Sequence, residues 1–123
     1  MGIDIYAQWR GQTVEEISRQ SASWLAPTAG NNGYLREAYH GVPYATMYLC
    51  NEAFDSGQAR IPAAVLRERL AHTLALVEER EQVLYNSGEN EIEVVKQSFE
   101  DFVALCEQKE EEAGEPVLIV ASY

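Results

Sequence analysis

Residues 61–114, IPAAVLRERLAHTLALVEEREQVLYNSGENEIEVVKQSFEDFVALCEQKEEEAG, decide the fold. Before Asn86-Ser87-Gly88, apolar residues recur at spacings of four, four, three and seven: Leu66, Leu70, Leu74, Val77 and Leu84. After it, they recur at spacings of three, four, three and four: Ile92, Val95, Phe99, Phe102 and Cys106. This spacing predicts two amphipathic helices, at about 62–86 and 90–113. Because few residues join them, they should fold back as an antiparallel hairpin with their apolar faces together.

Both ends of the chain predict strands. From Ile3 to Trp9 apolar residues occupy every second position, which indicates a strand with one buried face. Residues 117–122 follow Pro116 and are apolar on both faces, which is typical of a strand inside a sheet. The expected fold class is α+β, with a small sheet that pairs the N-terminal and C-terminal strands and is packed by the long hairpin and shorter helices. With 123 residues, the chain should form a single domain, 1–123.

A short helix and a loop are predicted after the first strand. Thr13-Val14-Glu15-Glu16 fits a capping box, in which the Thr hydroxyl and a Glu carboxylate each accept a hydrogen bond from a backbone N–H at a helix start. The helix would run for about three turns, with Val14, Ile17 and Trp24 or Leu25 as its apolar stripe. Residues 26–33 are rich in Gly, Asn and Pro, which indicates a connecting loop or a mobile lip.

The stretch 33–54 holds four of the seven tyrosines, and its start is compatible with two structures. Leu-Arg-Glu-Ala favours a helix that begins after Asn32 and ends at Gly41. Alternatively, residues 34–40 are extended and join the first strand. Pro43 suits the first turn of a second helix, on which Met47, Cys50 and Phe54 would form one stripe and Tyr44 and Tyr48 another.

The net charge of −11 lies mainly in the second half of the chain. Residues 1–60 carry six acids and four bases, whereas residues 61–123 carry fourteen acids and five bases. Because Lys and Arg contacts to phosphates drive nucleic-acid binding, we expect no direct nucleic-acid partner, and an anionic membrane surface is disfavoured for the same reason. A basic protein is the partner that this charge favours.

No segment predicts export or membrane insertion. The N-terminus has no basic flank or long apolar run, and residues 117–121 are far fewer than the roughly 20 that cross a bilayer. Cys50 and Cys106 have apolar neighbours, which favours reduced, buried packing residues. The expected location is cytoplasmic.

Candidate ligand-binding residues gather in one stretch: Tyr34, Arg36, Glu37, His40, Tyr44 and Tyr48. On a helix Arg36 and His40 would lie four residues apart on one face, where both could meet an anionic group. The tyrosines could line a pocket, and His40 could exchange protons near neutral pH. The alternative, which we favour, is that the tyrosines fill the gap between sheet and hairpin while Arg36 pairs with a carboxylate.

Patterns for catalysis, cofactors and metals are missing. Gly-x-Ser-x-Gly does not occur, and the two histidines, His40 and His72, do not stand at a metal-ligand spacing. Glu89, Glu91 and Glu93 alternate without the glycine turn and ligand order of a calcium loop. We therefore expect no cofactor and no metal, and enzyme is not the favoured class.

Two segments carry a resemblance. The opening Met-Gly-Ile-Asp-Ile-Tyr and the later Gly-Tyr-Leu-Arg-Glu-Ala-Tyr-His-Gly are similar to segments of small uncharacterised bacterial and phage proteins that begin Met-Gly-Ile/Leu-Asp-Ile-Tyr. The resemblance implies a small prokaryotic or phage-encoded domain and no particular activity.

The sequence thus favours a non-enzymatic protein–protein interaction or regulatory module that uses an acidic helical surface. A narrower form is an acidic nucleic-acid mimic, which would need carboxylates spaced like phosphates on one face. The alternative is a small-molecule-binding or catalytic domain around residues 34–48. The pattern is also compatible with a homodimer, because Val94, Val103 and Leu105 lie beyond the first apolar stripe and could be buried between two copies.

Overall fold

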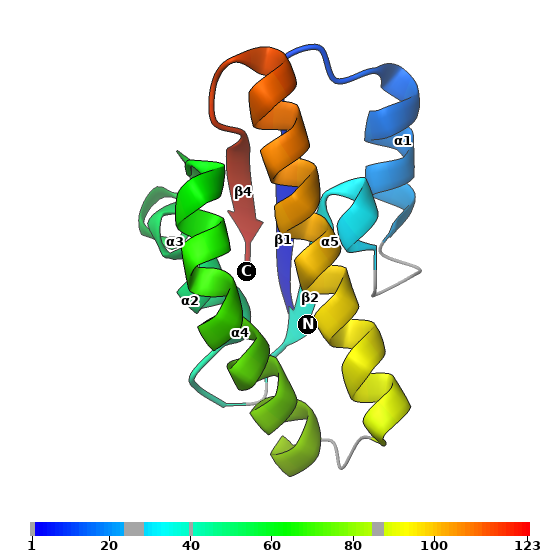
Figure 1. Cartoon of the computed structure of the whole chain (residues 1–123), viewed down its shortest axis with the longest axis vertical. Helices are drawn as coiled ribbons and strands as arrows, with labels where there is room; N and C mark the ends of the chain where they lie inside the picture. The colour runs from blue at the N-terminus through cyan, green and yellow to red at the C-terminus, as the bar shows by residue number, and fades with distance from the viewer. Residues whose placement is uncertain (1, 24–28, 40, 85–87) are drawn as a thin grey trace.

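The computed structural model describes residues 2–23, 29–39, 41–84 and 88–123. Within them four strands form one antiparallel sheet in the order β2-β1-β4-β3: β1 Gly2–Gln8, β2 Tyr34–Ala38, β3 Gln58–Arg60 and β4 Leu118–Ser122. The helices α4 (Ala63–Leu84) and α5 (Glu89–Ala113) cover one face of this sheet, as Figure 1 shows. The predicted α+β class is confirmed.

The pairing of the two chain ends is confirmed by the register of β1 and β4. Ile5 lies opposite Ala121, and Ala7 lies opposite Ile119. All four side chains are buried, because they point from the sheet toward the helices. As predicted for a strand that is apolar on both faces, β4 is internal and lies between β1 and β3.

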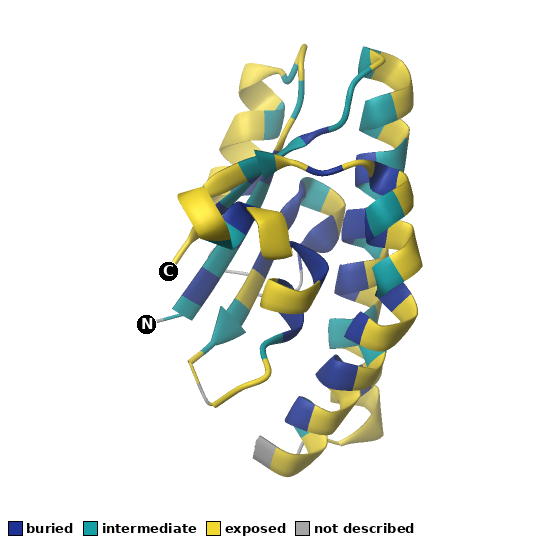
Figure 2. Cartoon of the chain, turned by 90° about the vertical axis from the view of Figure 1, so that its left-hand side faces the viewer, coloured by how far each residue is buried: buried dark blue, intermediate teal, exposed yellow. Residues whose placement is uncertain are grey.

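The bounds of the two hairpin helices agree with the predicted bounds to within two residues. Figure 2 shows its buried residues on the side toward the sheet and its exposed residues on the opposite side. Leu66 and Phe102 are fully buried, and complete burial stabilises the fold by about 1.5–3 kcal/mol for each large apolar side chain. Val103 is fully buried too, so it does not extend an outer apolar stripe with Val94, and the homodimer prediction loses this support.

The start of the central stretch is extended, so the helical interpretation is wrong for the described residues 34–38. β2 pairs with β1, with Leu35 opposite Ile5 and Arg36 opposite Asp4. Leu35 is buried in the core and Arg36 is exposed, which is the alternation of a strand. Burial of Leu35 beside Ile5 outweighs the modest helix preference of a few residues. His40 lies outside the described residues, so its predicted position cannot be compared.

The expected single helix after Pro43 is two helices, α2 (Ala45–Leu49) and α3 (Asn51–Ser56), which meet at Cys50. Cys50 is fully buried, whereas Met47 on the predicted stripe is 38% exposed. Pro43 precedes α2 by two positions and forms a cis peptide bond with Val42. Gly57, with a φ of +88°, ends α3 and leads into β3, which the sequence did not predict.

The helix α1 (Val14–Ala22) begins with the predicted capping box but packs through a different face. Val14 is 77% and Ile17 48% exposed, whereas Gln20 is buried, so the predicted apolar stripe is not the packing face. Trp24 and Leu25 lie outside the described residues. The buried Gln20 amide keeps hydrogen-bond partners, because its Nε2 donates to the carbonyl oxygens of Ala7, at 2.6 Å, and of Gly33.

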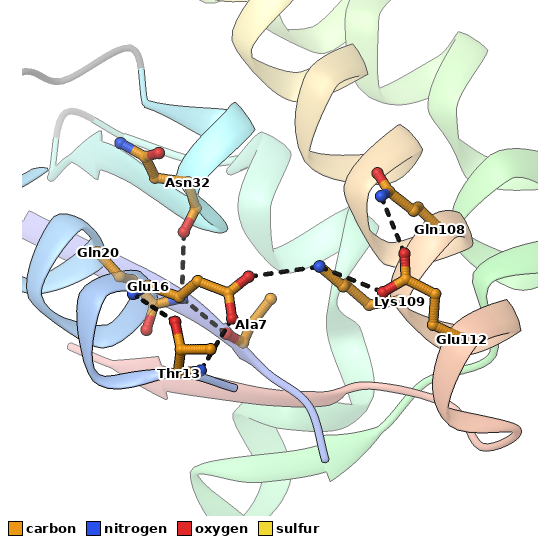
Figure 3. Close-up of polar contacts among 8 residues, drawn as sticks. All are labelled: Ala7, Thr13, Glu16, Gln20, Asn32, Gln108, Lys109 and Glu112. Atoms are coloured by element: carbon orange, nitrogen blue, oxygen red, sulfur yellow. Dashed lines mark hydrogen bonds and ion pairs between the residues drawn. The ribbon is translucent and has the colours of Figure 1, made fainter. Parts of the chain in front are cut away.

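A short 3-10 turn, η2 (Gly30–Asn32), explains why the Ala7 carbonyl accepts a hydrogen bond from the Gln20 side chain. The N–H of Gly33 donates to the carbonyl of Gly30, so it cannot donate to the facing carbonyl of Ala7. Figure 3 shows Gln20 directed at Ala7 and at the carbonyl of Asn32. The turn also packs on α5, where a Cβ at Gly30 would overlap the carbonyl oxygen of Ser98. The described part of the predicted loop is therefore a packed turn and not a lip.

Candidate functional site

Two of the candidate residues, Tyr34 and Arg36, meet Asp4 on the face of the sheet that points away from the hairpin. Arg36 Nη1 lies 2.7 Å from Asp4 Oδ1, and the Tyr34 hydroxyl donates to the same oxygen at 2.5 Å. Burial, aided by the hydrogen bond to Asp4, raises the pKa of Tyr34 to about 12. Tyr34 is fully buried and its ring packs against Tyr6, with the centroids 5.3 Å apart. Both residues are thus engaged in packing and pairing.

Glu37 points to the opposite face and is held by α2 and α4. Its carboxylate accepts hydrogen bonds from the backbone N–H groups of Ala45 and Thr46, both at 2.9 Å, and from the Thr46 hydroxyl at 2.6 Å. Arg80 Nε lies 2.8 Å from the same carboxylate, and the two side chains are only 9% and 7% exposed. Glu37 therefore satisfies the N–H groups at the start of α2 and forms a buried ion pair.

Arg80 ties Ala38 and residues 41–44 to α4. Its guanidinium donates to the carbonyl oxygens of Ala38, Gly41 and Pro43, at 2.5–3.1 Å, and lies 4.8 Å from the centroid of the Tyr44 ring. Sequence reasoning missed Arg80, although a signal was present. Arg80 stands three residues after Val77, on the buried stripe of α4, where a charge requires a partner.

Tyr39 lies at the edge of this network, and Tyr48 lies apart from it. Tyr39 is 39% exposed and meets Tyr44 edge-on, with centroids 6.2 Å apart. Tyr48 is equally exposed and packs on His72, 4.4 Å between centroids. The described candidate residues are therefore distributed over three places, and a small hollow of about 90 Å³ beside Arg80 is lined by none of them.

The hairpin forms the most acidic surface of the described chain. Residues 63–113 contain thirteen acids and five bases, and each of the five bases already lies within ion-pair distance of a carboxylate. Three of them, Arg69, Arg80 and Lys109, reach acids outside the hairpin: Glu52, Glu37 and Glu16. We call the exposed carboxylates the acidic hairpin surface: Glu68, Glu78, Glu79, Glu89, Glu91, Glu93, Glu100, Glu111 and Glu112.

An acidic hollow of about 550 Å³ lies where the hairpin ends near the start of β4. Its lining includes Glu107, Glu110, Glu111 and Glu115, together with Pro62, Gly114 and Pro116. Glu107 pairs with Arg67 at 2.5 Å, and this hydrogen-bonded contact lowers the pKa of the carboxyl. Glu110 accepts a hydrogen bond from the Ala63 N–H. Glu111 forms no ion pair with a described residue, so it remains available to an external cation.

Metal ligation, thiol chemistry and membrane insertion receive no support from the described residues. In them, no three His, Cys, Asp or Glu side chains are grouped so that they could hold a metal ion. Cys50 and Cys106 are free and buried, and desolvation raises the pKa of both thiols, which disfavours the reactive thiolate. Across the same residues, no helix has both the length and the apolar character needed to span a bilayer.

Comparison with protein-family models, with curated proteins and with solved structures gave no match for this chain.

Proposed function

We propose that this protein is a non-enzymatic interaction module whose acidic hairpin surface binds a basic protein segment. One observation carries the proposal: every Lys and Arg of the hairpin already lies within ion-pair distance of a carboxylate, and exposed carboxylates such as Glu68, Glu100 and Glu111 form no ion pair with a described residue. Exposed charges of one sign steer an oppositely charged partner and set which partners are rejected. The acidic hollow gives a lysine or arginine side chain of that partner a place to enter.

The distribution of charge supports a protein partner more than nucleic-acid mimicry. Glu89, Glu93, Glu100, Glu107 and Glu111 recur at spacings of four, seven, seven and four, so they share one side of α5. At a rise of 1.5 Å per residue, neighbours in this row stand roughly 6 or 10 Å apart. A single DNA strand carries a charge about every 3.4 Å of axis, so the row is sparser than a phosphate backbone.

The test uses a fluorescently labelled lysine-rich peptide and fluorescence anisotropy. The double variant E100Q/E111Q should bind the peptide several-fold more weakly than the wild-type chain. The control E15Q/D55N removes the same formal charge at two exposed carboxylates outside the hairpin and should bind as the wild type does. Binding should also weaken between low and moderate salt, because exposed charge pairs are screened over about 8–10 Å.

Equal loss in both double variants would mean that only overall charge matters, and the proposed surface would be rejected. Peptide binding that does not respond to salt would reject the electrostatic basis. A competition experiment tests nucleic-acid mimicry. If this chain displaces a basic DNA-binding protein from DNA, mimicry is favoured over recognition of a basic segment.

A further inference from the structure

A second hollow, on the face of the sheet that points away from the hairpin, has a different chemistry from the acidic hollow. It measures about 360 Å³, within the range of small-ligand sites, and we call it the arginine hollow: Gln8, Trp9, Arg10, Arg60, Glu115 and Leu118. Gln8, Leu118 and Arg60 are register partners in one row across β1, β4 and β3. The neighbouring row, which contains Ala7 and Ile119, faces the core, so this row faces away from the hairpin.

The two guanidinium groups are anchored to the turn that joins α5 to β4. Arg10 Nη2 donates to the carbonyl of Ala113, and Arg60 Nη1 donates to the carbonyl of Pro116 at 2.8 Å. A guanidinium has five N–H donors, so each arginine retains donors for a further acceptor. Arginine forks bind carboxylate and phosphate groups through two parallel hydrogen bonds. The turn thus holds both cations at the rim of one hollow.

Charge pairing singles out this hollow. All nine Lys and Arg residues belong to the described part of the chain, and only Arg10 and Arg19 lack a carboxylate within ion-pair distance there. Arg60 reaches its partner, Glu115, only at 3.7 Å. Arg19 borders a hollow of about 30 Å³, which has room for little more than a water molecule. Of the four hollows described here, the arginine hollow combines an unpaired cation with space for a ligand, whereas the others do not.

The apolar residues that line the arginine hollow indicate the chemical character of the rest of the ligand. Leu118 is half-buried and apolar, and Trp9, which also lines the hollow, is packed against the core, with its ring 5.3 Å from Lys109 Nζ. We propose that the arginine hollow binds a small organic anion, with its carboxylate or phosphate on Arg10 and Arg60 and its apolar or aromatic part against Leu118, next to Trp9. The arginine hollow shares Glu115 with the acidic hollow, but Arg10 and Arg60 do not belong to the acidic hairpin surface, so this proposal does not depend on the function proposed for that surface.

Glu115 allows a test in which one substitution should strengthen anion binding while others weaken it. It is the one carboxylate among the lining residues, so it opposes an incoming anion and competes for Arg60. The variants R10Q and R60Q should weaken anion binding by about tenfold each, the change that 1.4 kcal/mol of lost interaction produces. E115Q should instead tighten it, a gain that a misfolded variant cannot mimic. R19Q, which removes the other unpaired cation, should leave the affinity unchanged.

The probe is phenyl phosphate, titrated into the ¹⁵N-labelled full chain and followed by the indole N–H signal of Trp9. Benzoate tests whether a carboxylate serves as well as a phosphate, while inorganic phosphate and phenol supply the anion and the ring alone. We expect saturable shifts with phenyl phosphate or benzoate, and weaker ones with either fragment. Absence of saturation with both organic anions, equal binding of inorganic phosphate, loss in R19Q, or no gain in E115Q would each overturn the proposal.

Discussion

Two of the Arg–Glu ion pairs, Glu37–Arg80 and Glu107–Arg67, lie in opposite surroundings. Glu37 and Arg80 are 9% and 7% exposed, and their pair is enclosed by backbone N–H and carbonyl groups that use the remaining hydrogen-bonding capacity. Arg67 and Glu107, on the hairpin surface, are 42% and 41% exposed. The first pair fixes the path of a segment, whereas the second adjusts the charge of a surface. Burial, more than the identity of the charged groups, separates a structural role from one in binding.

The sharpest test of this contrast removes the arginine from each pair. Arg80→Ala leaves a buried carboxylate without its counter-ion and three carbonyl oxygens without their donor, so the free energy of unfolding should fall by about 3–5 kcal/mol. Arg67→Ala removes an exposed pair and should cost less than about 1 kcal/mol. Urea unfolding at neutral pH measures both variants.

A double-mutant cycle guards against attributing lost packing to lost charge. Arg80→Met keeps much of the apolar stem, and Glu37→Gln keeps an acceptor for the start of α2. The double variant should be more stable than the sum of the single losses predicts, by about 1–3 kcal/mol. Additive losses in this cycle would show that the buried pair is not an energetic unit, and the contrast with Arg67 and Glu107 would fail.

A smaller effect is expected where the buried group is neutral. Gln20→Ala removes the side chain that donates to the carbonyl oxygens of Ala7 and Gly33, so the cost should be about 1–3 kcal/mol. The matched control is Gln97→Ala, because Gln97 is exposed and donates only to Asp101 within the same helix, at 2.9 Å. Its expected cost is within about 0.5 kcal/mol. Equal urea midpoints for the two variants would contradict the role assigned to Gln20.

The same contrast explains which parts of the fold could be predicted from the sequence. Leu66, Leu70 and Phe102 repeat at helical spacing over many turns, so the hairpin was evident from local pattern alone. The packing face of α1 was not, because Val14 and Ile17 suggested an apolar face while a bond between Gln20 and the distant Ala7 decided the outcome. Local patterns specify elements, but polar contacts between elements fix how they dock.

The candidate site was less predictable for a related reason. Tyr34, Arg36 and Glu37 are close in sequence. Because side chains alternate along β2, however, Arg36 points away from the hairpin and Glu37 points toward it. β3 has only three residues, too few to display an alternating pattern. The arginine hollow joins Arg10 to Arg60 through strand pairing across the sheet, and no spacing within the sequence reports such a contact.

The smallest predicted effect concerns acid stability, and it comes from the exposed pairs. Hydrogen bonding to Arg67 lowers the pKa of Glu107 from its ordinary value of 4.5, and hydrogen bonding to Arg69 does the same for Glu52. A carboxyl whose pKa is lower in the folded state stabilises the fold fully above the unfolded pKa, and this contribution is lost as the pH falls through the folded pKa. Stability should therefore decline below about pH 4.5.

Because both carboxylates are partly exposed, solvent screening limits each contribution to a few tenths of a kcal/mol. The double variant E52Q/E107Q should lose that amount at pH 7 and show a shallower fall in stability between pH 5 and pH 3 than the wild type. Glu68→Gln, at an exposed carboxylate without a described ion-pair partner, is the control and should retain the wild-type slope. An unchanged slope in E52Q/E107Q would show that exposed pairs contribute nothing to stability, which would widen the contrast with Glu37 and Arg80. If E52Q/E107Q instead lost as much stability at pH 7 as a variant that breaks the buried Glu37–Arg80 pair, the exposed and buried pairs would not differ in energetic weight.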